Sequence, residues 1–238
     1  AGVGGLRAYW DDFMPALEHQ RDDGVDSWKR GFRSLHPFWM LKHLSNNTQA
    51  VLAAQFQARG EGVNFGGANA GTQALCSAIE SLQSQVIDQA IVVAYDTLLE
   101  PETLVEMAAR NVATSATANT LTSAYDLNAS GFVPGEAAAC LILERATDSN
   151  TRAKAYIRAA ESADHARGAG GHAAIETLMA PVKRVAGQEV LVDGCAQAHP
   201  QADLAERESL ANCISSDMRL TAIQSSLGNM GAATSLVQ

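Results

Sequence analysis

The sequence predicts an α/β protein with a largely parallel sheet. Residues 62–82 (GVNFGGANAGTQALCSAIESL) pass from a short apolar run to apolar residues three and four apart, which indicates a strand that turns into a helix. Residues 88–95 (DQAIVVAY) are almost continuously apolar, which is typical of a strand buried on both faces between helices. Strand and helix patterns of this kind alternate along the whole chain, so we expect one compact unit.

Before the central segment we expect short elements. They are a strand end with a glycine turn, a helix, a polar loop and two further helices, at residues 1–6, 9–20, 22–29, 37–43 and 47–59. Pro37 suits the first turn of a helix, Asn46 or Asn47 can cap the next one, and Gly60 can end it.

The central segment itself predicts a strand at residues 63–65, a turn at 66–68 and a helix from 69 to 82. Beyond it we expect strands at 88–95, 131–143 (continued by 155–160), 189–192 and 220–223, helices at 101–111, 204–214 and 228–237, and loops at 113–124 and 167–171.

Composition and charge limit the partners. The 238 residues carry a formal net charge of −9, whereas nucleic acids and anionic membranes are bound through Lys and Arg. No apolar run approaches the roughly 20 residues that span a bilayer, and Asp11, Asp12 and Glu18 interrupt any signal-peptide core. We therefore expect neither nucleic acid nor membrane as a partner.

Cysteines and histidines show no metal-binding spacing. Cys76, Cys140, Cys195 and Cys213 are widely separated and contain no CxxC pair, which favours reduced thiols in a cytoplasmic protein. The remaining candidates for a zinc site, His36, His43 and His172, have no Cys or carboxylate partner at a suitable spacing. We expect no metal and no cofactor.

The turn at residues 66–68 is the candidate functional site. A sharp strand-to-helix turn is where many enzymes place a nucleophile, because the N–H groups of the helix N-terminus stabilise an anion there. The apex of this turn carries Ala68, which has no nucleophilic atom. The arrangement resembles an acyl-transferring enzyme from which the chemistry has been removed.

Six stretches, in the same order along the chain, resemble the β-ketoacyl-acyl-carrier-protein synthases, enzymes of the thiolase-like fold. They are AGVGGL, HPFWMLKHLSNN, NFGGANAGTQAL, YDLNASGFVPGEAAACLILE, CAQAHPQADLAE and IQSSLGNMGAAT. The resemblance implies an α-β-α-β-α layered fold with mainly parallel mixed sheets, apparently trimmed at both ends. It further implies an N-terminal half at residues 1–154 and a shortened C-terminal half at 155–238, and it keeps structural positions at Gly71, Gly131, Gly135, Glu136 and Gly228.

The departures from the family pattern fall on its catalytic positions. Ala68 stands at the nucleophilic Cys, Cys195 and Ser225 at the two His residues, and Leu220 at the supporting Lys. A methyl group cannot attack a thioester, and a neutral thiol or hydroxyl does not replace an imidazole. We therefore expect no catalytic residue at these positions.

Degenerate family members of this kind resemble the chain-length factors. Such a subunit pairs with an active β-ketoacyl synthase, reaches the acyl carrier protein through that partner, and shapes the acyl tunnel in cytoplasmic polyketide, polyene or fatty-acid biosynthesis. The resemblance places the tunnel at Ala68, Asn69, Phe132, Cys195 and Ser225. It places the dimer interface at the strand of Val63, Asn64 and Phe65.

Two alternatives remain open from the sequence. The first is an independent acyl-thioester enzyme of the same fold that uses Cys195, with His199 four residues on as its partner, although Pro200 disfavours a regular helix that would join them. The second is a scaffold partner with no role in a tunnel.

Overall fold

The structure is a computed structural model that describes residues 1–4, 12, 33, 35–146, 152–160, 175–176, 179, 190–214 and 218–238. The expected loops at 22–29 and 167–171, and all of the expected helix at 9–20 except Asp12, lie outside the described residues.

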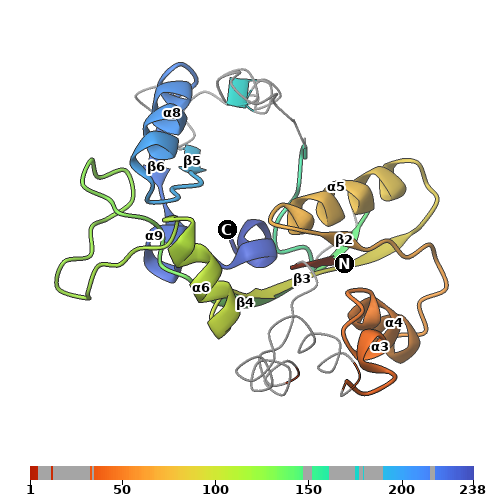
Figure 1. The fold of residues 1–238 in the computed structure, drawn as a ribbon. Coiled ribbons are helices and arrows are strands. Elements are labelled where there is room, and N and C mark those ends of the chain that lie inside the picture. The colour runs from red at the N-terminus through yellow and green to blue at the C-terminus, as the bar shows by residue number, and fades with distance from the viewer. Residues whose placement is uncertain are drawn as a thin grey trace.

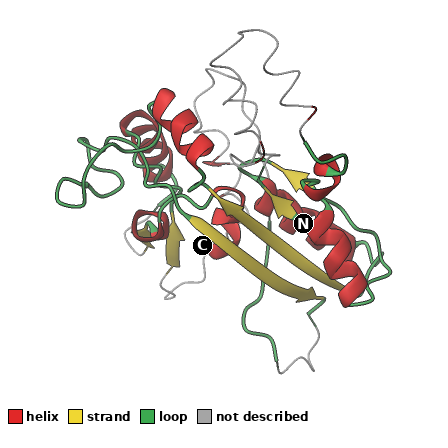
Figure 2. Ribbon diagram, turned by 60° about the horizontal axis from the view of Figure 1, so that its bottom comes forward, coloured by secondary structure: helices red, strands yellow, loops and turns green. Residues whose placement is uncertain are grey.

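A four-stranded mixed sheet forms the centre of the fold, in the order β2-β1-β3-β4 (Figure 2). Its strands are β1 (Gly2–Val3), β2 (Phe65–Gly66), β3 (Gln89–Thr97) and β4 (Glu136–Glu144). Strand β1 pairs in parallel with both β2 and β3, whereas β3 and β4 form an antiparallel ladder from the Gln89–Glu144 pair to the Thr97–Glu136 pair. The sheet is therefore parallel on one side of β3 and antiparallel on the other.

Alternate residues of β3 point to opposite faces of this sheet. Ala94 is fully buried on one face, against Met230 and Ala233, where η1 (Gly231–Ala233), α10 (Thr234–Val237) and α5 (Ala70–Gln83) pack. Tyr95 lies on the other face, where its phenolic oxygen accepts a 2.7 Å hydrogen bond from Thr48 Oγ1 of α4 (Asn47–Gln55). Helix α4 and its neighbour α3 (Trp39–Lys42) therefore cover the face opposite to α5 (Figure 1).

A second, two-stranded parallel sheet contains β5 (Val190–Asp193) and β6 (Met218–Thr221). Helices α8 (Pro200–Ala211) and α9 (Ile223–Leu227) lie beside this sheet in Figure 1, while α6 (Pro101–Ala109) follows β3 at the edge of the first sheet. Together the sheets and their flanking helices give the mixed α/β architecture that the sequence predicts.

Most of the predicted elements appear within a few residues of their expected positions, with differences that have local causes. Pro200 occupies the first helical position of α8, where its missing N–H and fixed φ are favourable, so this helix begins before residue 204. The expected helix at 228–237 begins only at residue 231, as η1 followed by α10, because Gly228 adopts a φ of 81° and Asn229 forms a β-bridge with Pro134. Helix α9, at residues 223–227, is not among the predicted elements. Residues 155–160 form no strand, so the expected continuation of β4 is wrong.

The end of α4 also differs from expectation. The helix stops at Gln55 rather than near Gly60. Gln57 takes the left-handed conformation that a glycine usually supplies after a helix, with a φ of 53°.

Small residues let the central helix approach its neighbours closely. The buried side of α5 consists of Ala70, Gly71, Ala74 and Leu82. Of the apolar residues three and four apart that predict this helix (Leu75, Ala78, Ile79 and Leu82), only Leu82 is buried. A side-chain carbon added at Gly71 would lie 2.5 Å from the carbonyl oxygen of Ala232, so α5 and η1 pack backbone to backbone.

The division into halves at residues 1–154 and 155–238 stays a prediction. Contacts do cross it, because η1 and α10 pack on β3 and β4, and the Ala232 N–H donates to Asp96 Oδ2 at 2.9 Å.

We expect Gly71→Ala to lower the free energy of unfolding by about 1–3 kcal/mol, because the new methyl group meets a backbone carbonyl that cannot move without separating α5 from η1. Urea denaturation measures the change. Gly66→Ala is the matched control, since a carbon added there has no neighbour within 4 Å. Equal effects of the two substitutions would contradict the close α5–η1 contact.

Candidate functional site

The turn between β2 and α5 carries Ala68 at its apex. Strand β2 ends at Gly66, Gly67 has a φ of 108°, and α5 begins at Ala70. The N-cap residue Asn69 makes no side-chain capping bond, so the first turn of α5 keeps backbone donors without a side-chain acceptor. The strand-turn-helix prediction is therefore confirmed in its geometry, and the group at its apex is a methyl.

A cavity of about 620 Å³ lies beside this turn, between α6 and the start of α5. It brings together Ala68 and Phe132, two of the five residues predicted to line a tunnel. Its walls are part apolar and part polar, with Leu98, Met107, Val112 and Phe132 on the one hand and Asp96, Glu102, Gln197 and Asn229 on the other. Thr103, Glu106 and Arg110 add further polar groups to the wall, so a ligand with both apolar and polar parts fits this lining.

The other predicted tunnel residues do not line this cavity. Asn69 is exposed at the N-cap of α5. Ser225 is also exposed, and its Oγ accepts a 3.2 Å hydrogen bond from the Ala124 N–H. Leu220, predicted to stand at the position of the supporting Lys and not to line the tunnel, lies in β6 with 41% of its surface exposed. Gln197, two residues after Cys195, takes the place in the wall that the sequence assigned to Cys195.

A carboxylate holds the loop that carries Gln197. Glu206 of α8 accepts hydrogen bonds from the N–H groups of Cys195 at 2.6 Å and Ala196 at 3.0 Å, and from the Tyr125 hydroxyl at 3.1 Å. Burial, together with the Glu206 carboxylate, raises the pKa of the Tyr125 phenol well above its ordinary range. Tyr125 therefore remains a neutral donor to Glu206 at all physiological pH values.

This loop has a backbone shape that favours glycine. Ala196 and Ala198 have φ values of 46° and 53°, in the left-handed region. The Gly131 N–H donates to the Ala198 carbonyl at 2.9 Å, which joins the loop to the segment that leads to Phe132. Gly131 itself has a φ of 120°, and a side-chain carbon there would lie 2.6 Å from the Val112 carbonyl oxygen.

The environment of Cys195 disfavours a thiolate. The residue as a whole is exposed, but its Sγ accepts a 3.6 Å hydrogen bond from Gln197 Nε2. Loss of hydration raises the pKa of this thiol, and the carboxylates of Glu206, Asp203 and Asp193 act in the same direction, against the Gln197 hydrogen bond. Within the described residues no hydrogen bond joins Cys195 to His199. The arrangement is therefore unlike an activated Cys–His pair.

Glu136, Gly135 and Gly228, which were predicted to be structural positions, make contacts within the fold. Glu136 is exposed, and its Oε2 accepts a 2.9 Å hydrogen bond from Thr97 Oγ1 rather than from a backbone group. Gly135 and Gly228 lie where residues 133–135 meet residues 227–229, in contacts that include the Gly135 N–H to Asn229 carbonyl bond of 2.8 Å.

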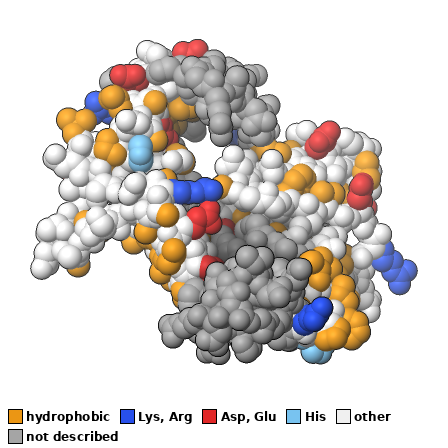
Figure 3. Space-filling model, viewed as in Figure 1, with side chains coloured by type: hydrophobic (Ala, Val, Ile, Leu, Met, Phe, Trp, Pro, Cys, Tyr) orange, Lys and Arg blue, Asp and Glu red, His pale blue; other side chains and the backbone are white. Residues whose placement is uncertain are grey.

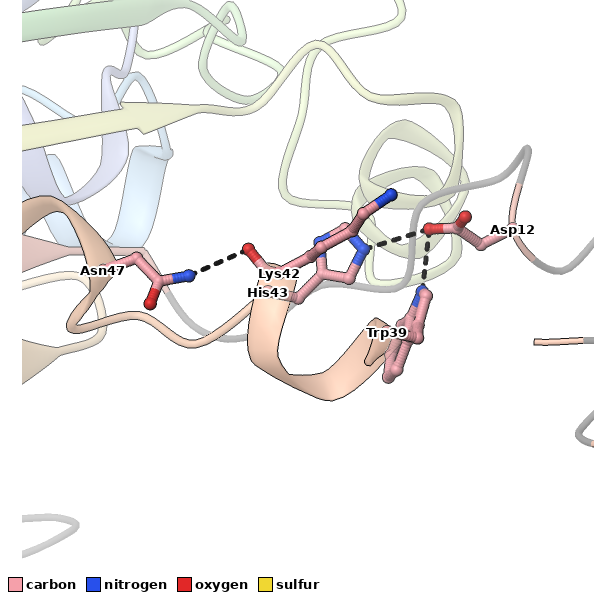
Figure 4. Close-up of polar contacts among 5 residues, drawn as sticks. All are labelled: Asp12, Trp39, Lys42, His43 and Asn47. Carbon is pink, nitrogen blue, oxygen red and sulfur yellow. Dashed lines mark hydrogen bonds and ion pairs between the residues drawn. The ribbon is translucent and has the colours of Figure 1, made fainter. Parts of the chain in front are cut away.

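The structure also contains a polar cluster that the sequence analysis missed. Asp12 Oδ2 accepts a 2.8 Å hydrogen bond from Trp39 Nε1 and lies 3.1 Å from His43 Nε2, and the two rings are 4.8 Å apart (Figure 4). Asp12 and His43 are 31 residues apart, and no spacing signal connects them. His43 lines a second cavity of about 600 Å³, between α3–α4 and the sheet. The cluster anchors α3 to the chain at Asp12.

The described part of the chain contains neither a metal-binding cluster nor a membrane-spanning helix. No group of three or more His, Cys, Asp or Glu side chains is arranged to hold a metal ion there. No helix in that part is both long and apolar enough to cross a bilayer.

Comparison with known protein families identifies the family of this chain. Residues 13–149, more than half of the chain, match the family described as β-ketoacyl synthase, N-terminal domain. The chain belongs to the β-ketoacyl synthase family. A comparison with curated protein sequences found no match.

Solved ketosynthase structures have the same fold. A type II polyketide synthase acyl-carrier protein in complex with its ketosynthase bound to the hexaketide (AntDE:AntF) superposes with a TM-score of 0.71 and 17% identity, over 99% of this chain and 62% of that one. The ishigamide ketosynthase/chain length factor gives 0.71 and 19%, over 98% and 59%. The ketosynthase from module 6 of the bacillaene synthase from Bacillus subtilis 168 gives 0.58 and 17%, over 79% and 36%.

These likenesses establish the fold. The predicted thiolase-like α/β fold is confirmed, and this β-ketoacyl synthase family member spans 36% to 62% of the length of the three ketosynthase structures.

We expect Ala196→Gly and Ala198→Gly each to raise the free energy of unfolding by about 0.5–1 kcal/mol. An alanine in the left-handed region costs about 1–2 kcal/mol, and the extra freedom of glycine in the unfolded chain offsets part of the gain. Thermal and urea denaturation measure the change. Ala202→Gly, inside α8, is the control and lowers stability by about 1 kcal/mol. The left-handed loop would be refuted if all three substitutions were equally destabilising.

Proposed function

We propose that this chain is a non-catalytic, chain-length-factor-like subunit. It pairs with an active β-ketoacyl synthase and lines part of the tunnel that holds the growing acyl chain in polyketide, polyene or fatty-acid biosynthesis. The single observation that carries the proposal is the methyl group of Ala68 at the apex of the β2–α5 turn, beside a cavity of about 620 Å³. The site keeps the space for an acyl chain and lacks a group that could capture it.

The other three degenerate positions support the absence of catalysis. The Cys195 thiol has a raised pKa and faces carboxylates, the Ser225 hydroxyl accepts a backbone hydrogen bond, and Leu220 has no charge. None of them offers the imidazole or ammonium donor that the family uses at neutral pH. The likeness to the ishigamide ketosynthase/chain length factor is consistent with such a subunit.

The surface near the β2 edge supports a partner subunit. Among the strands that the structure describes, β2 pairs with β1 alone, so its other edge is open to a further strand. Val63, two residues before β2, is 39% exposed. Helices α3 and α4 bury none of their residues, and Figure 3 shows hydrophobic side chains gathered over them. The exposed members of this group are Phe38, Met40, Leu41, Leu44, Val51 and Phe56.

A contiguous apolar surface of this kind usually marks a protein–protein contact. We place the synthase on the segment of Val63, Asn64 and Phe65, of which Phe65 alone belongs to β2, and on the adjoining α3–α4 surface. The acyl carrier protein is then reached through that synthase in a cytoplasmic assembly. A scaffold role without a tunnel uses the same surface, and the experiments on Ala68 below separate the two.

An independent acyl-thioester enzyme is the alternative of a different class. It would require acylation of Cys195, whose raised pKa keeps the thiol protonated at pH 7 and leaves less thiolate than an ordinary cysteine has. We expect the isolated chain to remain unmodified when it is incubated with octanoyl N-acetylcysteamine and examined by intact-protein mass spectrometry. A stoichiometric acyl adduct on Cys195 at pH 7, lost in Cys195→Ser, would establish the enzyme instead.

The tunnel role is tested by filling the cavity. In a complex reconstituted with an active β-ketoacyl synthase and acyl carrier protein, we expect Ala68→Trp to shorten the products, because the indole occupies space beside Phe132 that the chain would otherwise enter. Product masses after chemical release measure the length. Ala138→Trp, which fills the other cavity, is the matched control and leaves the length unchanged.

Two results of this experiment speak against the proposal. If Ala68→Trp co-purifies with the synthase and the products keep their length, the chain acts as a scaffold. If neither variant nor the unaltered chain binds a synthase, the subunit role itself is wrong.

A further inference from the structure

The loop that carries Gln197 is strained on both sides of that residue. Ala196 and Ala198 have φ values of 46° and 53°, in the left-handed region that is unfavourable for alanine. Strain of this kind persists only where the surrounding structure holds it in place, and it is concentrated at functional sites. Of the loop residues 194–198, Gln197 is the one that lines the cavity beside Ala68. The strained positions therefore flank the residue that reaches the cavity.

Hydrogen bonds also fix the main chain before and after Gln197. Before it, Glu206 accepts the Ala196 N–H at 3.0 Å. After it, the Ala198 carbonyl accepts the Gly131 N–H at 2.9 Å. A fixed position matters more for a hydrogen bond than for an apolar contact, because a hydrogen bond weakens steeply as it departs from a linear arrangement. The loop is thus suited to hold the amide of residue 197 in one place.

The Gln197 amide has a donor that a ligand can engage. Its Nε2 lies 3.6 Å from the Cys195 sulfur, and a thiol sulfur is a weak acceptor. A carbonyl oxygen is a stronger acceptor, so it replaces the sulfur when it comes within hydrogen-bond distance of Nε2. Gln197 is also in contact with solvent, and the gain is therefore the modest one of a neutral hydrogen bond exchanged with water.

Two other donors in the cavity wall have different surroundings. The Arg110 side chain is 70% exposed and lies 2.9 Å from Glu106 Oε1, and an exposed, paired cation discriminates weakly between ligands. Asn229 Oδ1 accepts the Gly231 N–H at 2.9 Å, so the turn that follows Asn229 sets the orientation of this amide. Gln197 is the donor whose position the strained loop determines.

We infer, on the basis of the proposed function, that Gln197 is a specificity-determining residue whose Nε2 donates a hydrogen bond to a carbonyl oxygen within the bound acyl chain. Glu206 is its positioning residue, and the Tyr125 hydroxyl donates to the same carboxylate at 3.1 Å. The favoured ligand is an acyl chain with a carbonyl group beyond the thioester.

Isothermal titration calorimetry on the full chain tests the role of Gln197. The probes are N-acetylcysteamine thioesters of octanoate and of 3-, 5- and 7-oxooctanoate. We expect at least one oxo probe to bind about fivefold more tightly than octanoyl, as a neutral hydrogen bond predicts. Gln197→Leu removes the donor with little change in size, so this ratio falls to about one. Gln201→Leu, at an exposed glutamine of α8, is the matched control and keeps the ratio.

The same titration tests the role of Glu206. Glu206→Gln replaces one acceptor oxygen by a donor, so we expect the oxo probe to lose more affinity than octanoyl. In the Gln197→Leu background the same substitution leaves the ratio at about one, because the two residues act as a pair. Tyr125→Phe removes one bond of the clamp and lowers the ratio less, which gives a second measurement if Glu206→Gln does not fold. Glu208→Gln, at an exposed carboxylate of the same helix, is the control.

Each contrary result has a distinct meaning. Equal affinity for octanoyl and every oxo probe overturns the inference and leaves the acyl-binding function intact. A ratio that survives in Gln197→Leu assigns the donor to another residue and overturns the inference as well. Equal losses for octanoyl and the oxo probes in both clamp variants overturn the positioning role of Glu206. Failure of the unaltered chain to bind any probe overturns the acyl-binding proposal together with the inference.

Discussion

The carboxylate of Asp96 joins the two parts of the chain that build the cavity. It lies at the end of β3, where Oδ1 accepts the Thr97 N–H at 2.9 Å and Oδ2 accepts the Ala232 N–H at 2.9 Å. Gly4 and Gly231 lie against its oxygens and have no side chain that would occupy that space. Because η1 is tied to the sheet at this point, α10 can pack on β4, and the segment with Asn229 forms a wall opposite α6.

Small side chains allow close packing where the helices meet the sheet. Ala70, Ala94, Ala232 and Ala233 are completely buried, so helix and sheet meet at short distances with little side-chain volume between them. Dense contacts of this kind tolerate little change in volume. Stability therefore resides in the sheet, α5 and the η1–α10 segment, whereas α3 and α4 bury no residues and present apolar side chains outward. The proposed subunit role uses both features, the densely packed core and the apolar side chains on the surface of α3 and α4.

Local patterns predicted α5, β3, α6 and β4, because each has a strong apolar period or run. They did not predict that β3 and β4 are antiparallel, since pairing direction depends on the path of the chain between residues 97 and 136. In the site, Ala68 and Phe132 were predicted through family motifs. Glu102 and Gln197 were not, because they reach the cavity through long-range packing that leaves no spacing signal. The Asp12–His43 contact was not predicted from the sequence for the same reason.

The Glu206 clamp has a consequence for how this region can change. A single carboxylate accepts hydrogen bonds from two backbone N–H groups and a phenol, so the bend is held through the main chain of Cys195 and Ala196 rather than through their side chains. The contour of this wall of the cavity, to which Gln197 contributes, is therefore set by the main chain. A substitution of the Cys195 side chain changes the chemistry offered at this position and leaves that contour in place.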